Sequence, residues 1–131
     1  MLFEARGRLT SNSHEPMEGE GLLYEVKWTF DKAGVELRAR VIGQLPAAAV
    51  LQFIVPVIAR QSEQIEQASS QIVRISKSRG TLLVTIDGAN RFESIRSEHA
   101  FNLVPGFEAV PLTVAILPGK DVRVRIEADG T

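Results

Sequence analysis

Hydrophobic residues occupy every second position along two consecutive stretches, and this period of two is the strongest signal in the chain. From Leu22 to Phe30, and again from Val35 to Val41, apolar side chains alternate with mostly polar ones. The two stretches flank the turn Asp31-Lys32-Ala33-Gly34, in which Asp comes first and Gly last. Such a pattern predicts a β-hairpin with one apolar, packed face and one charged, hydrated face.

Further short apolar segments follow at intervals that suit a β-sandwich or barrel. Their ranges are Val50–Ile58, Ile72–Lys77, Thr81–Ile86, Phe92–Ile95, Val110–Leu117 and Val122–Ile126. The turn signals Ser78-Arg79-Gly80 and Pro118-Gly119 separate neighbouring segments, and Pro111 indicates an edge strand or a strand start. Residues 60–70 contain Ile65 as their one large apolar residue, so we expect an exposed crossover with a strand around Glu63 to Gln67.

These elements predict an all-β fold, an antiparallel β-sandwich of eight or nine strands. We expect a single domain over residues 1–131, which is a fragment or accessory domain of a longer chain. Hydrophobic residues make up 44% of the sequence, enough to fill a core, so a disordered chain is excluded.

The charge and cysteine content remove several classes of function. The 15 Lys and Arg residues balance 16 Asp and Glu residues, which argues against a nucleic-acid binder. The absence of cysteine excludes a disulfide scaffold, a thiolate metal site and a cysteine nucleophile. We find neither a signal peptide nor an apolar run of ~18 residues, so we expect no membrane contact. This fits a cytosolic protein and, equally, a domain of a longer secreted chain.

Candidate catalytic and metal-binding groups are scarce. His14 lies beside Glu15 and Glu18, which suits a hard metal ion, but solvated acids explain the same pattern without one. His99 follows Ser97 and Glu98, and adjacent residues do not make a triad, which is assembled in space. We therefore expect no metal, no cofactor and no catalytic residue, and we predict that this chain alone is not an enzyme.

Two arginine pairs form the main candidate binding site. Arg38 with Arg40, and Arg123 with Arg125, each lie on one face of a predicted strand, because residues i and i+2 point the same way. If these strands are neighbours, the four side chains form a basic stripe suited to carboxylate or sulfate groups of an acidic polymer. The alternative is ordinary cross-strand pairing with glutamates such as Glu36.

The aromatic residues divide into two groups. Tyr24, Trp28 and Phe30 share the apolar face of the first predicted hairpin strand, so we expect them in the core, with Trp28 buried. Phe101 and Phe107 flank a predicted loop, and they are the better candidates for contact with sugar rings. The alternative for these two is a plug over the core.

The stretch FNLVPGFEAVPLTVAIL (residues 101–117), together with the hairpin LLYEVKWTFDKAGVELRARV (residues 22–41), resembles the C-terminal β-sandwich of heparinase II/III-like polysaccharide lyases. The similarity extends over residues 21–128 as a succession of strands. It implies an all-β accessory domain beside a helical toroid in which most of the lyase chemistry occurs. None of His14, His99 and Tyr24 matches a catalytic position of that family.

The resulting expectation is a non-catalytic accessory domain that supports a catalytic domain and contacts acidic glycan. Its partners are then the catalytic domain of a parent enzyme or an acidic polysaccharide, and its location is periplasmic or secreted. The alternative is a stand-alone binding protein that associates through a sheet face or edge. A small enzyme built in a barrel cavity ranks last.

Overall fold

The computed structural model describes residues 1–8, 22–44, 51–60, 63–87, 90–93 and 104–129. These residues form nine strands, which confirms the all-β prediction: β1 (Leu2–Arg8), β2 (Leu23–Phe30), β3 (Gly34–Ile42), β4 (Leu51–Arg60), β5 (Ile65–Ser69), β6 (Ile72–Lys77), β7 (Gly80–Ile86), β8 (Phe107–Ile116) and β9 (Val122–Asp129). Within them no helix is long and apolar enough to cross a membrane.

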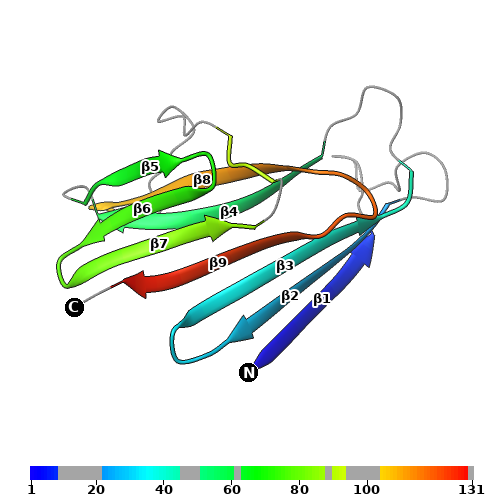
Figure 1. Ribbon diagram of the computed structural model, residues 1–131, viewed down its shortest axis with the longest axis horizontal. Helices are drawn as coiled ribbons and strands as arrows, with labels where there is room; N and C mark the ends of the chain where they lie inside the picture. Colours follow the sequence, from blue (N-terminus) through cyan, green and yellow to red (C-terminus); the bar gives the residue numbers. More distant parts are fainter. Residues whose placement is uncertain (9–21, 45–50, 61–62, 88–89, 94–103, 130–131) are drawn as a thin grey trace.

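The strands form two antiparallel sheets. Seven strands make the larger sheet, in the order β1-β2-β3-β9-β7-β6-β5, and β4 pairs with β8 in a second, smaller sheet. Figure 1 shows β1 at one side of the larger sheet and β9, in red, between β3 and β7. The chain passes to the smaller sheet at β4, returns for β5 to β7, passes over again at β8, and inserts β9 last.

The predicted hairpin is confirmed as β2 and β3. Phe30 pairs with Val35, and the N–H of Asp31 donates to the Gly34 carbonyl at 3.0 Å. Glycine is required at position 34 because a Cβ there would clash with the carbonyl oxygen of Ile126 on β9. The turn sequence therefore closes the hairpin and lets β9 approach β3.

The hydrophobic core lies between the two sheets. The smaller sheet contributes the inward residues of β4 and β8, and the larger sheet contributes those of β3, β6, β7 and β9. The fully buried side chains include Leu22, Ile75, Ile86, Leu112, Val114, Val122 and Val124. At one end Lys77 closes this layer, because its Nζ donates to Glu63 and to the carbonyl of Ile58 on β4.

The core does not extend to the far end of β2, which corrects the expectation for Trp28. Tyr24 and Val26 pack against the core, whereas Trp28 is only half-buried and Phe30 is exposed. Phe30 makes an edge-to-face contact with Phe3 on β1 at 5.8 Å between ring centroids. The pattern gave the correct face, but a two-stranded sheet is too narrow to cover all of it.

Three elements differ in detail from the prediction. β1 was not predicted, because its inward residues Phe3, Ala5 and Gly7 decrease in size and give a weak alternation. The strand expected at Glu63–Gln67 begins two residues later as β5. Of the segment predicted at 92–95, the described residues contribute an isolated bridge between Phe92 and Val114, and Ile95 lies outside them.

Pro111 lies inside β8, directly opposite Pro56 on β4, and β8 is an edge strand as predicted, because the smaller sheet contains two strands. Neither proline has an N–H, so the two can face each other only where the opposed residues exchange no hydrogen bonds. On the outward face of this smaller sheet, Ile54 and Ile58 are 50% and 49% exposed. The middle of this face is apolar, whereas Gln52 and Thr113 at one end donate hydrogen bonds to the Glu93 carboxylate.

Matched isoleucine truncations test the assignment of the core. Ile86→Ala removes a side chain that is 2% exposed and should lower the free energy of unfolding by ~2–5 kcal/mol. Ile54→Ala makes the same change on the open face of β4 and should cost less than about 1 kcal/mol. Urea unfolding followed by tryptophan fluorescence measures both, and equal losses would contradict the two-sheet packing.

Candidate functional site

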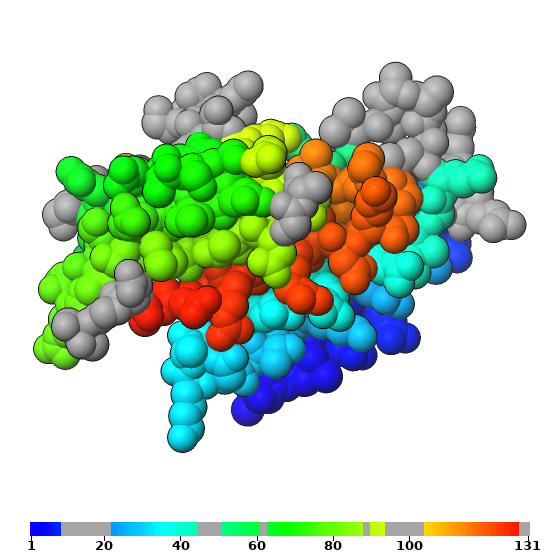
Figure 2. Space-filling model, in the orientation of Figure 1, coloured from blue at the N-terminus to red at the C-terminus, as the bar shows by residue number. Residues whose placement is uncertain are grey.

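The outward face of the larger sheet carries the charged residues of β1, β2, β3 and β9. Alternation along each strand sends the apolar side chains inward to the core, so the intervening charged ones share the opposite face. Figure 2 shows β9, in red, as a strip of surface between β3 and β7. Both predicted arginine pairs lie on this face, on neighbouring strands.

Three cations stand directly opposite one another across this face. Lys27 on β2 pairs with Arg38 on β3, and Arg38 pairs with Arg123 on β9. Like charges in directly opposed positions destabilise an antiparallel sheet. We call these three residues the cation row.

The two ends of the cation row are neutralised by carboxylates. Lys27 Nζ lies 3.5 Å from Glu4 on β1. Arg123 lies 3.6 Å from Glu36 and 4.0 Å from Asp87. These pairs are solvent-exposed, so each contributes little to stability, but together they offset the repulsion at the ends of the row.

The side chain of Arg38, at the centre of the row, has no ion pair or hydrogen bond with any other residue in the described ranges. Its Nε is buried and lacks a hydrogen-bond partner. A buried donor without an acceptor costs ~1–3 kcal/mol. Lys27 and Arg123 flank Arg38 on the two neighbouring strands, so its side chain lies between two other cations.

A shallow depression of about 100 Å³ opens beside Arg38. It is lined by Glu25, Lys27, Arg38, Arg40 and Asp121. Both carboxylates already face a cation: Arg40 lies 3.7 Å from Asp121, and Arg6 lies 3.6 Å from Glu25. The unopposed charge in the depression is therefore that of Arg38, and it suits a small anion.

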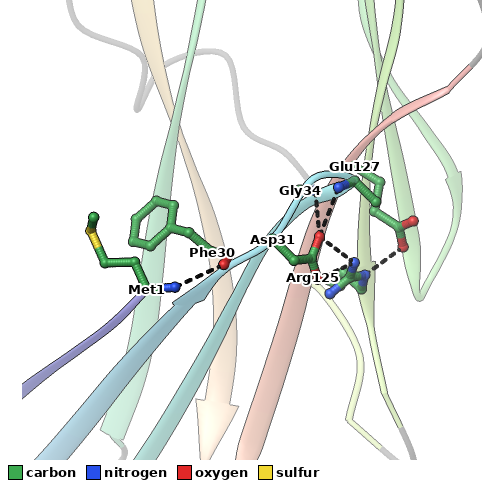
Figure 3. Close-up of polar contacts among 7 residues, drawn as sticks. Met1, Phe30, Asp31, Gly34, Arg125 and Glu127 are labelled. Carbon is green, nitrogen blue, oxygen red and sulfur yellow. Dashed lines mark hydrogen bonds and ion pairs between the residues drawn. The ribbon is translucent and has the colours of Figure 1, made fainter.

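Arg125 has a structural role at the other end of β9. Figure 3 shows its guanidinium between Asp31 and Glu127, at 3.0 Å and 2.9 Å. Asp31 also accepts hydrogen bonds from the N–H groups of Ala33 and Gly34 at 2.8 Å and 2.9 Å. One carboxylate thus closes the β2–β3 turn and anchors β9 beside it.

These contacts shift both ionisation equilibria. The hydrogen bond from Arg125, followed by those from the two backbone N–H groups, lowers the pKa of Asp31 below its ordinary value. The same bond raises the pKa of Arg125. On the β6 side of the larger sheet, the hydrogen bond from Lys77 lowers the pKa of Glu63 below its ordinary value.

The structure brings all four predicted arginines onto one face but gives them different surroundings. Arg40, Arg123 and Arg125 are engaged by carboxylates, as the alternative of cross-strand pairing expects, and Arg38 is not. Phe107 begins β8 and is partly buried, with the Arg60 guanidinium 5.7 Å from its ring centroid. The described part of the predicted loop, residues 104–106, lies outside the strands and ends where Phe107 begins β8. Phe101, His14 and His99 lie outside the described residues.

Sequence reasoning missed Lys27 as a member of the site. The signal was present, because a turn that places Phe30 opposite Val35 also places Lys27 opposite Arg38. The contact between Arg38 and Arg123 had no such signal, since it depends on the register of two strands far apart in the sequence.

A second hollow of about 300 Å³ lies between the sheets, where Tyr24 and Val41 face Leu51 and Phe53. Its lining is mainly apolar, and its polar residues are Tyr24, Glu25, Arg40 and Gln52. The described residues contain no cluster of three or more His, Cys, Asp or Glu that could hold a metal ion.

Comparison with known proteins relates this chain to polysaccharide lyases. The profile of the ulvan lyase C-terminal domain family matches residues 1–129. A broad-specificity ulvan lyase of Formosa agariphila is 22% identical over 105 residues, which are 80% of this chain. The chain spans 16% of the length of that relative. The predicted resemblance to a polysaccharide lyase C-terminal domain is thus confirmed, and neither match names the heparinase II/III-like lyases.

The pair of Asp31 and Arg125 predicts a pH-dependent stability. Asp31→Asn keeps an oxygen for the two turn N–H groups but removes the charge facing Arg125, so its melting temperature at pH 7 should fall below that of the unmodified chain. Because the folded pKa of Asp31 is lowered, its contribution is present above the unfolded pKa and is lost as the pH falls through the folded pKa.

The difference in melting temperature should therefore shrink between roughly pH 5 and pH 2. Glu66→Gln is the matched control, since Glu66 meets Arg74 at 3.8 Å on an exposed edge and should change little. Thermal scans at several pH values measure both variants. A difference that stays constant down to pH 2 would contradict the role assigned to Asp31.

Proposed function

The chain belongs to the ulvan lyase C-terminal domain family, and from this premise we propose that it is the non-catalytic accessory β-sandwich of a polysaccharide lyase. In this role it packs against a catalytic domain and contacts acidic glycan. The observation that carries the proposal is the family match over residues 1–129. A relationship to the heparinase II/III-like lyases stays a prediction, which rests on the succession of strands over residues 21–128.

The charged face supports the glycan contact. The Formosa agariphila relative is a broad-specificity ulvan lyase, which makes a polysaccharide the first candidate ligand. Arginine forks suit carboxylate and sulfate groups, and Arg38, Arg40, Arg123 and Arg125 share one open surface. Phe101 and Phe107 remain proposed contacts to sugar rings, although Phe107 is already engaged by Arg60.

The apolar face supports the contact with a catalytic domain. Ile54, Pro56 and Ile58 follow one another along the outward side of β4, and all three are exposed. A contiguous exposed apolar patch is typical of a surface that another protein covers. The chain spans 16% of its relative, so a catalytic body of the same polypeptide is the natural occupant.

The alternative of a stand-alone binding module draws on the edge of the larger sheet. Among the described strands none pairs with the outer side of β1, and Leu2 and Phe3 on this strand are exposed. However, β1 also carries Glu4, Arg6 and Arg8, and charged side chains on an edge strand oppose pairing with another chain. A chain that dimerises in solution by light scattering, and loses this on Phe3→Lys, would favour the alternative.

We predict that the 131-residue chain binds ulvan without cleaving it. Elimination at a uronate needs a positioned base, an acid for the leaving oxygen and neutralisation of the carboxylate. The arginines supply the last of these groups. Electrophoresis through gels containing ulvan should show retardation that decreases with added salt, because exposed charges are screened.

Dextran, which is neutral, serves as the control polymer and should cause no retardation. Absorbance from unsaturated uronates should stay at the level of the blank. Steady product formation that is lost in His99→Ala or Tyr24→Phe would overturn the non-catalytic assignment. Equal mobility in ulvan and dextran gels would overturn the glycan contact.

A second prediction concerns the apolar face. In a lyase that carries this domain, Ile54→Glu combined with Ile58→Glu should separate one cooperative melting transition into two, because charges replace the apolar contact. In the isolated chain the same variant should melt within a few degrees of the unmodified one, since both side chains are half-exposed. Calorimetry measures both. A single unchanged transition in the lyase would contradict docking through β4.

A further inference from the structure

We propose that Arg38 forms a discrete oxyanion site, in which its guanidinium binds a carboxylate or sulfate ester of an acidic polysaccharide in the depression between Lys27 and Arg40. The inference rests on the proposed glycan contact and narrows it from a face of the sheet to one side chain. It differs from the sequence-based expectation, in which four arginines act as an equivalent stripe.

The first argument is the pattern of neutralisation across the sheet. Glu4 offsets Lys27, Glu36 and Asp87 offset Arg123, and Asp121 offsets Arg40. Within the described ranges no carboxylate lies within ion-pair distance of Arg38, which stands between two other cations. An anion bound here would relieve the repulsion along the cation row and supply the missing counter-charge.

The second argument is the unused hydrogen-bonding capacity of Arg38. Its Nε is buried without an acceptor, whereas buried donors in folded proteins nearly always have one. Arginine presents its N–H groups in a rigid planar fork that matches the two oxygens of a carboxylate or sulfate. The fork is held by β3, a central strand paired on both sides, so little ordering is needed on binding.

The third argument is size. The depression holds about 100 Å³, whereas roughly 10–15 Å³ of such space is enough for one water molecule. A carboxylate or sulfate group therefore has room beside Arg38. The polymer would therefore lie across the open face, with one anionic group inserted beside Arg38 and its rings outside.

The carboxylates of the depression set the specificity. Glu25 and Asp121 line the same space, and each already faces an arginine. They repel an anion that approaches off-centre, and so they confine the bound group to the position next to Arg38. A diffuse basic patch would lack this restriction and would bind polyanions according to their charge density alone.

The test compares Arg38→Gln with Arg74→Gln in the 131-residue chain. Both variants remove one arginine charge from the outward face of the larger sheet, but Arg74 lies on β6 and pairs with Glu66. Affinity is measured by calorimetry with polygalacturonate, which carries carboxylates, with carrageenan, which carries sulfate esters, and with neutral dextran. Inorganic sulfate serves as a competitor that lacks the polymer.

We expect Arg38→Gln to weaken binding to at least one charged polymer by about tenfold or more, as the loss of a charged hydrogen bond implies. Arg38→Lys should fall between, because it keeps the charge and loses the fork. Arg74→Gln should change affinity less than about twofold. Without ligand, Arg38→Gln should melt at the same temperature as the unmodified chain or higher, since it removes one of three opposed cations.

Two results would overturn the site. Equal weakening in Arg38→Gln and Arg74→Gln would mean that the face binds as a diffuse patch, and the accessory role would stand without a discrete site. A lower melting temperature with unchanged affinity in Arg38→Gln would assign Arg38 to folding. If the unmodified chain binds neither charged polymer, the glycan contact of the proposed function fails as well. Failure of the Arg38 site alone is therefore distinguished by retained polymer binding.

Discussion

The structure depends on the insertion of β9 between β3 and β7. The first three strands form one meander and β5 to β7 form another, and β9 is the strand that joins them into one sheet. Its inward residues Val122 and Val124 are fully buried beneath the smaller sheet. Gly34 leaves room for its backbone, and Asp31 holds its outward arginine. Because β9 pairs with β3 across most of the chain, the sheet is completed by non-local contacts, which fold slowly.

The same strand links stability to the candidate site. β9 places Arg125 against the hairpin turn, where two acids receive it, and places Arg123 beside Arg38, where like charges meet. The ion pairs of Arg125 stabilise the sheet, whereas the placement of Arg123 opposite Arg38 destabilises it, although the two arginines are only two positions apart. An unfavourable arrangement that a protein retains next to a depression is typical of a binding function, since stability and function compete at such positions.

The sequence was informative wherever the structure depends on local pattern. Alternation from Leu22 to Val41 gave the hairpin and its two faces, and the Asp31–Gly34 turn fixes a register that places Lys27 opposite Arg38. Local pattern could not give the pairing of β3 with β9, because register between distant strands is set by the assembled core. Nor could it give the half-burial of Trp28, which depends on how far the two-stranded sheet reaches. β1 was not predicted from the sequence because Gly7, which lies against the Tyr24 ring, contributes no apolar side chain to the alternation.

The two open faces suit two different partners. The face of β4 presents Ile54, Pro56 and Ile58, whereas the larger sheet presents the cation row on the opposite side of the sandwich. Under the proposed function, packing of β4 onto a catalytic domain leaves the cation row exposed to the polymer. The domain would then hold an acidic chain at a fixed distance from the active site, which raises the local substrate concentration without any chemistry of its own. Such a role requires rigidity between the faces, and the close-packed core between the sheets supplies it.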